Sequence, residues 1–224
     1  GDTQKTEATS NKPQETQNAA VEDLSLKTII DSAWQINLDY SPQMAYSLGD
    51  ESKASLLADL SPETLAEKNL RQKTLLSSLK QLDKSKLSKT DKINAQLLQY
   101  QLQNSVDLYT YKDHYLPITA ESGFHAYIAS IANTPLNTAE DYQHYLNKLN
   151  ALPTYFAQQT FWLKQGSING ITPAKITLAG FEDSISAYIV EVEDSGYYKP
   201  FTDFPDHFSE QQKTKLAAEG KKVD

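Results

Sequence analysis

The sequence predicts an all-α fold, arranged as an irregular bundle of several helices. Apolar residues recur three or four positions apart along most of the chain, which is the period of an amphipathic helix. Several of these segments follow a serine or threonine with an acid or glutamine three residues later, which is the pattern of a capping box. The sequence contains no run of alternating apolar residues long enough to predict a strand.

The start of the chain differs in composition from the rest. Residues 1–20 contain no large apolar residue, so they cannot offset the entropy lost on ordering and are predicted to form a flexible polar tail. Two interpretations of this tail stay open: a terminus without a role, or a tether between a lipid anchor and a folded domain. Residues 21–224 are predicted to form a helical domain.

Three helices are predicted in the first part of this domain, over residues 23–39, 42–49 and 62–82. In the first of them, apolar residues recur at helical spacing from Leu26 to Leu38. Ser41 and Ser61 each precede a proline, which suits an N-cap followed by the first position of a helix. Gly49 suits a helix end because glycine readily adopts the left-handed conformation found there.

Further helices are predicted to begin near residues 89, 124, 139, 153, 173 and 210. The first of these has an apolar set near one face, namely Ile93, Leu97, Tyr100 and Leu108. The one starting at Pro153 ends near residues 166–170, and the one starting at Pro173 runs through Ile189. Residues 194–208 are predicted to form a loop packed by its own aromatic rings. The last helix has barely begun at Asp224, which predicts an incomplete part of a larger helical protein.

The charge balance argues against nucleic acid as a partner. The chain has 21 Lys+Arg against 29 Asp+Glu, a net charge of −8, whereas nucleic-acid binding requires a basic surface. Arg71 is the single arginine, so a bidentate phosphate clamp is not expected either. The chain has no cysteine, which excludes disulfides, thiolate metal sites and a cysteine nucleophile.

His144 raises the question of a metal site. It follows Glu140 and Asp141 by four and three positions, so one helical face could hold all three. A zinc-peptidase helix instead carries two histidines one turn apart, and the four histidines of this chain are all farther apart than that. We therefore favour a solvated or paired histidine on a helix, and we assign no metal-binding residue.

No catalytic residue is predicted in this chain. A serine nucleophile needs a base and an orienting acid, and the sequence has no G-x-S-x-G motif. The dense acids at residues 182–183 and 191–194 point apart along a helix, so a solvated acidic surface is the favoured interpretation.

Tyrosines are numerous, 13 in all, and many fall in the central third of the chain. We favour helix packing, with the hydroxyls reaching water or backbone, over an aromatic cleft for peptide or sugar. The tyrosines concerned are Tyr100, Tyr109, Tyr111, Tyr115, Tyr127, Tyr142, Tyr145 and Tyr155.

The segment SGFHAY, residues 122–127, provides the candidate for a ligand-facing surface. Gly123 precedes the predicted apolar helix 124–131 and could let the backbone approach a ligand closely. Gly123, Phe124, His125 and Tyr127 are therefore the candidate cleft-facing residues. The alternative is that Gly123 only starts a helix.

The order of these signals resembles the amino-terminal part of the bacterial "domain of unknown function 885" family. The matching segments are Ser41–Gly49, Leu87–Asp91, Gly123 before Ile128–Ala132, Thr138–Tyr142, Tyr145–Leu149 and Gly166–Gly170 before Pro173. The resemblance covers residues 22–193. Each segment is short, so the resemblance rests on their order and spacing.

The resemblance implies a larger zinc-metallopeptidase-like protein. Members of the family are much longer, and their later half carries an H-E-x-x-P-G-H element similar to that of zinc peptidases, in which histidines hold zinc and the glutamate activates water. This chain lacks that element, so zinc is expected only in the full-length protein and no cofactor is expected here. The resemblance also implies export, as a periplasmic protein or a membrane-anchored lipoprotein with a lipid at its amino terminus.

These observations lead to two functional interpretations. The favoured one is the amino-terminal helical portion of such a protein, which forms one wall of a substrate cleft and is not catalytic alone. Its partners would be the carboxy-terminal half of its own full-length chain and a peptide substrate. The alternative is a non-catalytic helical binding or scaffolding module that uses a tyrosine-rich face.

Overall fold

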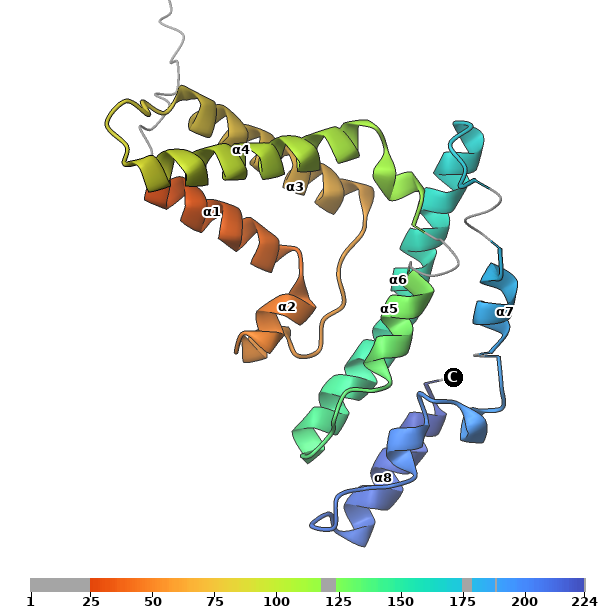
Figure 1. The fold of residues 1–224 in the computed structure, drawn as a ribbon. Helices are drawn as coiled ribbons and strands as arrows, with labels where there is room; N and C mark the ends of the chain where they lie inside the picture. Colours follow the sequence, from red (N-terminus) through yellow and green to blue (C-terminus); the bar gives the residue numbers. More distant parts are fainter. Residues whose placement is uncertain (1–24, 118–123, 175–178, 188, 224) are drawn as a thin grey trace, which may run out of the picture.

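The computed structural model describes residues 25–117, 124–174, 179–187 and 189–223, and these residues form helices and turns without a strand (Figure 1). The all-α prediction is therefore confirmed. The predicted polar tail, residues 1–20, lies outside the described residues. The α-helices are α1 (Leu26–Asp39), α2 (Pro42–Ser47), α3 (Pro62–Gln81), α4 (Lys89–Thr110), α5 (Phe124–Ile131), α6 (Ala139–Ile168), α7 (Phe181–Ser186) and α8 (Glu210–Lys221). The 3₁₀ turns are η1 (Glu51–Lys53), η2 (Asp113–Tyr115), η4 (Val192–Asp194) and η5 (Lys199–Phe201).

Local capping signals set most of the helix starts. The side chains of Ser25, Ser61 and Ser88 each accept a hydrogen bond from the backbone N–H three residues later. Complete capping boxes open α6, at Thr138 and Asp141, and α8, at Ser209 and Gln212. Ser41 is the N-cap residue of α2 and Pro42 occupies its first turn, as predicted, although the Ser41 side chain makes no capping hydrogen bond.

The first hydrophobic core lies among α1, α3 and α4, which Figure 1 shows packed together. Ile29 of α1 and Leu79 of α3 are fully buried at its centre. The face of α4 that enters this core consists of Ala95, Leu102 and Val106. These are aliphatic side chains at helical spacing, so the three helices bury one stripe each.

The apolar set predicted on α4 does not belong to this core. Ile93, Leu97, Tyr100 and Leu108 are exposed, on the side of the helix opposite to Ala95 and its buried neighbours. The sequence gives α4 two apolar faces, and α1 and α3 cover only one of them. The expectation that Tyr100 serves in helix packing was therefore wrong for the described part of the chain.

The second core lies where the aromatic loop after η4 packs against α6 and α8. Tyr142 and Tyr145 of α6 are almost completely buried there, and their hydroxyls donate to the carbonyls of Pro200 and Tyr197, each at 2.7 Å. The rings of Phe204 and Phe208 pack at 5.9 Å between centroids. The predictions of tyrosine packing at these positions and of a ring-packed loop are confirmed.

Helix α6 continues past Pro153, where a new helix was predicted, so that boundary was wrong. Proline lacks the N–H that would bond to the carbonyl of Leu149, but its fixed φ is close to the helical value. Pro153 is exposed, so its ring faces solvent. The packing of Tyr142, Tyr145 and Trp162 on either side of it holds α6 as one helix.

The end of α6 was predicted correctly, whereas the helix expected from Pro173 through Ile189 is confirmed only over α7 (Phe181–Ser186). Gly170, with φ of 70°, follows the helix, and the N–H of Ile171 donates to the carbonyl of Gly166 at 2.7 Å, as in a Schellman motif. Residues 171–174 are not helical, and residues 175–178 lie outside the described part. The described helix in this region, α7, is short and begins directly after Gly180, with φ of 82°.

Candidate functional site

The candidate cleft-facing residues are only partly described. Gly123 lies outside the described residues. Phe124 and His125 form the first turn of α5, as predicted, and their side chains also lie outside the described part of the chain. Tyr127 is described, and its ring packs 5.6 Å from that of Tyr155 on α6.

Tyr127 lines a cavity of about 210 Å³ between α2, the segment after η1, α5 and α6. Its lining residues include Tyr46, Leu57, Ile131 and Lys148. Burial raises the pKa of the Tyr127 hydroxyl, and nearby Tyr155 raises it further. Burial also lowers the pKa of the Lys148 ammonium. The described lining thus offers phenol and amine groups and no carboxylate.

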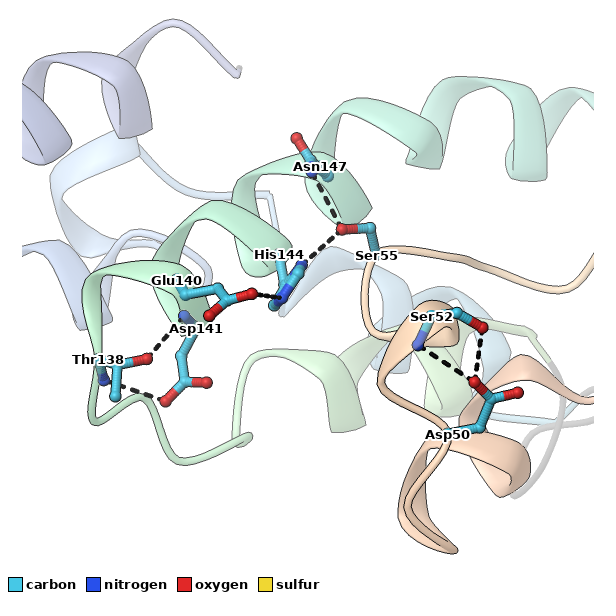
Figure 2. Close-up of polar contacts among 8 residues, drawn as sticks. All are labelled: Asp50, Ser52, Ser55, Thr138, Glu140, Asp141, His144 and Asn147. Atoms are coloured by element: carbon cyan, nitrogen blue, oxygen red, sulfur yellow. Dashed lines mark hydrogen bonds and ion pairs between the residues drawn. The ribbon is translucent and has the colours of Figure 1, made fainter.

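Figure 2 shows that His144 of α6 contacts the segment after η1 through Ser55. The Oγ atom of Ser55 lies 2.8 Å from Nδ1 of His144. Nδ2 of Asn147, one turn further along α6, donates to the same Oγ at 3.0 Å. Nε2 of His144 lies 3.4 Å from Oε1 of Glu140 on the preceding turn.

This serine–histidine–acid order matches that of a serine hydrolase, but its environment does not. In such a triad the acid is buried and holds the histidine in place. The Glu140 side chain is 82% exposed, so solvent screens its attraction for the imidazole. The Ser55 hydroxyl is occupied as an acceptor by Asn147. We therefore interpret the cluster as a clip that fastens the segment after η1 to α6.

The prediction that His144 is solvated or paired with another side chain agrees with this geometry. Asp141 does not join the cluster, because its carboxylate accepts from the backbone N–H of Thr138 at 3.0 Å, in the capping box of α6 (Figure 2). It also accepts from the backbone N–H of Asn137 at 2.9 Å. Sequence reasoning missed the partner Ser55, which is 89 positions away from His144 and carries no local motif. Only a contact between distant segments could have identified it.

Metal binding does not fit the described residues. Within the ranges that the structure describes, no group of three or more His, Cys, Asp or Glu side chains could hold a metal ion. Among the residues that the structure describes, the zinc that the family resemblance implies therefore has no ligand set.

An exposed apolar stripe runs along α4. Ile93, Leu97, Tyr100 and Leu108, followed by Tyr111 directly after the helix, are between 44% and 79% exposed. Their spacings of three, four and eight residues place them on one side of the helix. The tyrosines of α6 are thus buried, whereas Tyr100 and Tyr111 on this stripe are exposed.

The fold and these features define a helical protein without a described catalytic centre. The chain belongs to the family described as bacterial protein of unknown function (DUF885), whose family model matches residues 42–223. Comparison with curated proteins gives no match. Among the described helices, none is both long enough and apolar enough to cross a membrane.

Proposed function

We propose that this chain is the non-catalytic helical portion of a longer, exported protein, and that the stripe on α4 packs against the remainder of that protein. In this proposal the remainder carries zinc and the peptidase-like chemistry. The helical portion forms one wall of a cleft for a peptide, and a lipid anchors the amino-terminal tail to a membrane.

The observation that carries the proposal is the stripe itself. From Ile93 to Tyr111 it extends about 27 Å at a rise of 1.5 Å per residue. Exposed apolar side chains that gather on one side of a helix often mark a surface that contacts another protein segment. Burying these side chains would contribute about 25 cal/mol per Å² of apolar area, which favours a large, lasting contact.

The family resemblance, and the lack of a catalytic centre among the described residues, both favour the rest of the same protein as the partner of the stripe. The resemblance supplies a second half with its own zinc element. The described part of this chain supplies neither a metal ligand set nor an activated nucleophile, since the Ser55–His144 pair serves as a clip. A structural role beside a catalytic half is consistent with the family resemblance and with the lack of a catalytic centre among the described residues.

One observation favours the binding-module alternative. Tyr100 and Tyr111 are the most exposed aromatic residues of the stripe, at 72% and 79%, and tyrosine is enriched where proteins contact one another. In that case the stripe would bind a separate protein instead of another part of the same chain.

The first test is the product of the full natural gene. We expect a mass well above the 25.1 kDa of this chain. We also expect about one zinc per molecule, as for a single catalytic site. A metal-free product of the mass of this chain would overturn the proposal and leave the binding module.

The second test is Leu97→Glu, made both in this chain and in the full-length protein. In this chain Leu97 is exposed, so we expect no change in the urea midpoint of unfolding. In the full-length protein the buried charge should lower the free energy of unfolding by about 2 kcal/mol or more. Gln96→Glu, on an exposed neighbouring position, is the matched control. Equal behaviour of Leu97→Glu in both proteins would contradict docking on this face.

A further inference from the structure

The cavity beside Tyr127 is large enough to hold a small organic molecule. It lies between α2, the segment after η1, α5 and α6, and its volume is about 210 Å³. An apolar cavity of about 150 Å³ is known to bind benzene, so this one has room for a molecule of that size with one polar substituent. The polar groups on its walls indicate which substituent would fit.

Lys148 of α6 provides a half-buried cation in the wall of this cavity. Its ammonium group has neither an ion pair nor a hydrogen bond within the described part of the chain. Burial lowers the pKa of this ammonium, and no acid among the described residues opposes the effect. A charge that is partly removed from water is stabilised by a partner of opposite charge. Lys148 would therefore gain from an anion bound in the cavity.

Two tyrosine hydroxyls line the same cavity. They belong to Tyr127 of α5 and Tyr46 of α2, and burial raises the pKa of each. Neither hydroxyl has a hydrogen-bond partner among the described residues. A phenol O–H is a good donor to an ionised oxygen, and such charge-assisted bonds are stronger than neutral ones. The cavity therefore combines one cation with donors that suit an anion.

The acids of this region do not line the cavity. Burial raises the pKa of Tyr46, and the nearby Glu51, Asp141 and Glu140 raise it further, but none of these acids belongs to the described lining. Lys53 lines the cavity as a second cation, although an acid outside the cavity also attracts it. The described lining thus carries two ammonium groups and no carboxylate.

Aliphatic side chains complete the wall and restrict the kind of anion. Ala54 and Ile131, which are 4% and 5% exposed, line the cavity together with Leu57. An inorganic phosphate would leave this apolar surface without a partner, and phosphate is best held by the planar fork of arginine. The single arginine, Arg71, is not part of the described lining. A carboxylate on a small apolar body matches both the charge and the apolar wall.

We propose that this cavity binds a small organic carboxylate, of about the size of benzoate. The carboxylate pairs with the ammonium of Lys148 and accepts a hydrogen bond from the hydroxyl of Tyr127. The apolar body lies against Ala54 and Ile131. Neither the stripe on α4 nor another part of a longer protein takes part, so the proposal stands apart from the proposed function.

The first test compares three molecules of similar shape on the whole chain, namely the anion benzoate, the neutral benzamide and the cation benzamidine. A ligand that binds only the folded state raises the melting temperature. We expect millimolar benzoate to raise it above the value in sodium chloride of the same concentration, and the other two molecules to raise it less. Equal melting temperatures in benzoate and in sodium chloride would overturn the proposal and leave water as the occupant. An equal rise with all three molecules would contradict recognition of the negative charge.

Two variants locate the site. Lys148→Met removes the charge while keeping an apolar stem, and Tyr127→Phe removes only the hydroxyl. We expect each to weaken benzoate binding about tenfold or more, the effect of losing a hydrogen bond to a charged group. Lys164→Met, at an exposed position of the same helix, is the matched control and should bind as the wild type does. Far-UV circular dichroism checks that each variant is folded. Undiminished binding in either Lys148→Met or Tyr127→Phe would contradict the site as proposed.

Discussion

Gly166 shows how closely a single residue can be constrained by neighbouring backbone. It lies near the end of α6, and a Cβ atom added there would lie 2.6 Å from the carbonyl oxygen of Ile171 and 2.9 Å from that of Tyr115. Both obstacles are main-chain atoms, which cannot move aside as a side chain can. The close approach of α6 to η2 therefore depends on glycine at this position.

We predict that Gly166→Ala lowers the free energy of unfolding by about 1 to 3 kcal/mol, the range found for overpacked sites. Urea unfolding followed by circular dichroism measures it. Gly196→Ala is the control, because a Cβ atom there meets nothing within 4 Å. Equal urea midpoints for the two variants would mean that α6 and η2 do not approach as closely as described.

Asp59 gives a prediction about pH. The hydroxyl of Thr64 donates to its carboxylate at 2.6 Å and the N–H of Ser61 at 3.0 Å, and these bonds lower its pKa despite some burial. A lowered pKa in the folded state gives stability that is present above the unfolded pKa of about 3.9 and lost as the pH falls further. Asp59 is exposed, so solvent limits the effect to under about 1 kcal/mol.

We therefore predict that Asp59→Asn is less stable than the wild type at pH 7, and that the difference shrinks toward zero below about pH 3.9. Urea midpoints measured across this range test it. Thr64→Val removes the strongest donor and should reduce the pH dependence as well. A difference that grows on acidification would contradict the assignment.

At the scale of elements, the sequence predicts helix starts better than helix faces. N-caps such as Ser61 and Ser88 act within one turn, so their effect is visible in a few neighbouring letters. Which face of α4 becomes buried depends on α1 and α3, which lie elsewhere in the sequence. Two apolar stripes with similar spacing cannot be ranked without that information.

Proline is the second point at which local rules were insufficient. Pro153 is typical of a helix start, yet α6 carries it in its interior. A proline inside a helix and a proline at a helix start differ in whether a backbone hydrogen bond is lost. An interior proline leaves the carbonyl of Leu149 without its helical donor, whereas a proline at the first position of a new helix leaves none unpaired.

We predict that Pro153→Ala raises the free energy of unfolding by about 1 to 2 kcal/mol, since alanine restores the N–H and is the best helix former. Part of the gain is offset by the greater freedom of the unfolded chain. Thermal unfolding measures the change. Thr154→Ala, at the adjacent exposed position, should change stability by less. A loss of stability in Pro153→Ala would support a helix break at this residue.

At the scale of the whole molecule, two hydrophobic cores are joined by polar and aromatic contacts. The Ser55–His144 clip is one of these, and Gln158 provides another because its Oε1 accepts the N–H of Leu60 at 2.8 Å. The ring of Trp162 on α6 packs 4.5 Å from that of His114. These partners lie tens of residues apart, so no local motif in the sequence indicates that they pair.

Asn69 of α3, which is 8% exposed, illustrates the same limit. An asparagine within a predicted helix is expected on the surface, because asparagine is mostly exposed in proteins. Its burial follows from the packing of α4 and η2 over α3. The sequence therefore predicted the helices around Asn69 but not its burial.

The contacts between the cores lead to a prediction about cooperativity. Besides accepting from Leu60, Gln158 donates through Nε2 to the carboxylate of Asp59 at 2.8 Å. Gln158→Ala removes both bonds and leaves the part-buried N–H of Leu60 without its acceptor, which costs about 1 to 3 kcal/mol. The substitution leaves the residues of both hydrophobic cores unchanged. It should therefore reduce the extent to which the two cores unfold together.

We predict that hydrogen exchange distinguishes the two cores in Gln158→Ala. In the wild type the slowest amides of α3 and α6 should open together, with the free energy of global unfolding. In the variant, one group of helices should open at a lower free energy than the other, because a weakened contact permits partial unfolding. Thr160→Ala, exposed on the same helix, should preserve the common opening. If α3 and α6 lose protection equally in Gln158→Ala, then the described residues form one cooperative unit in spite of their two cores.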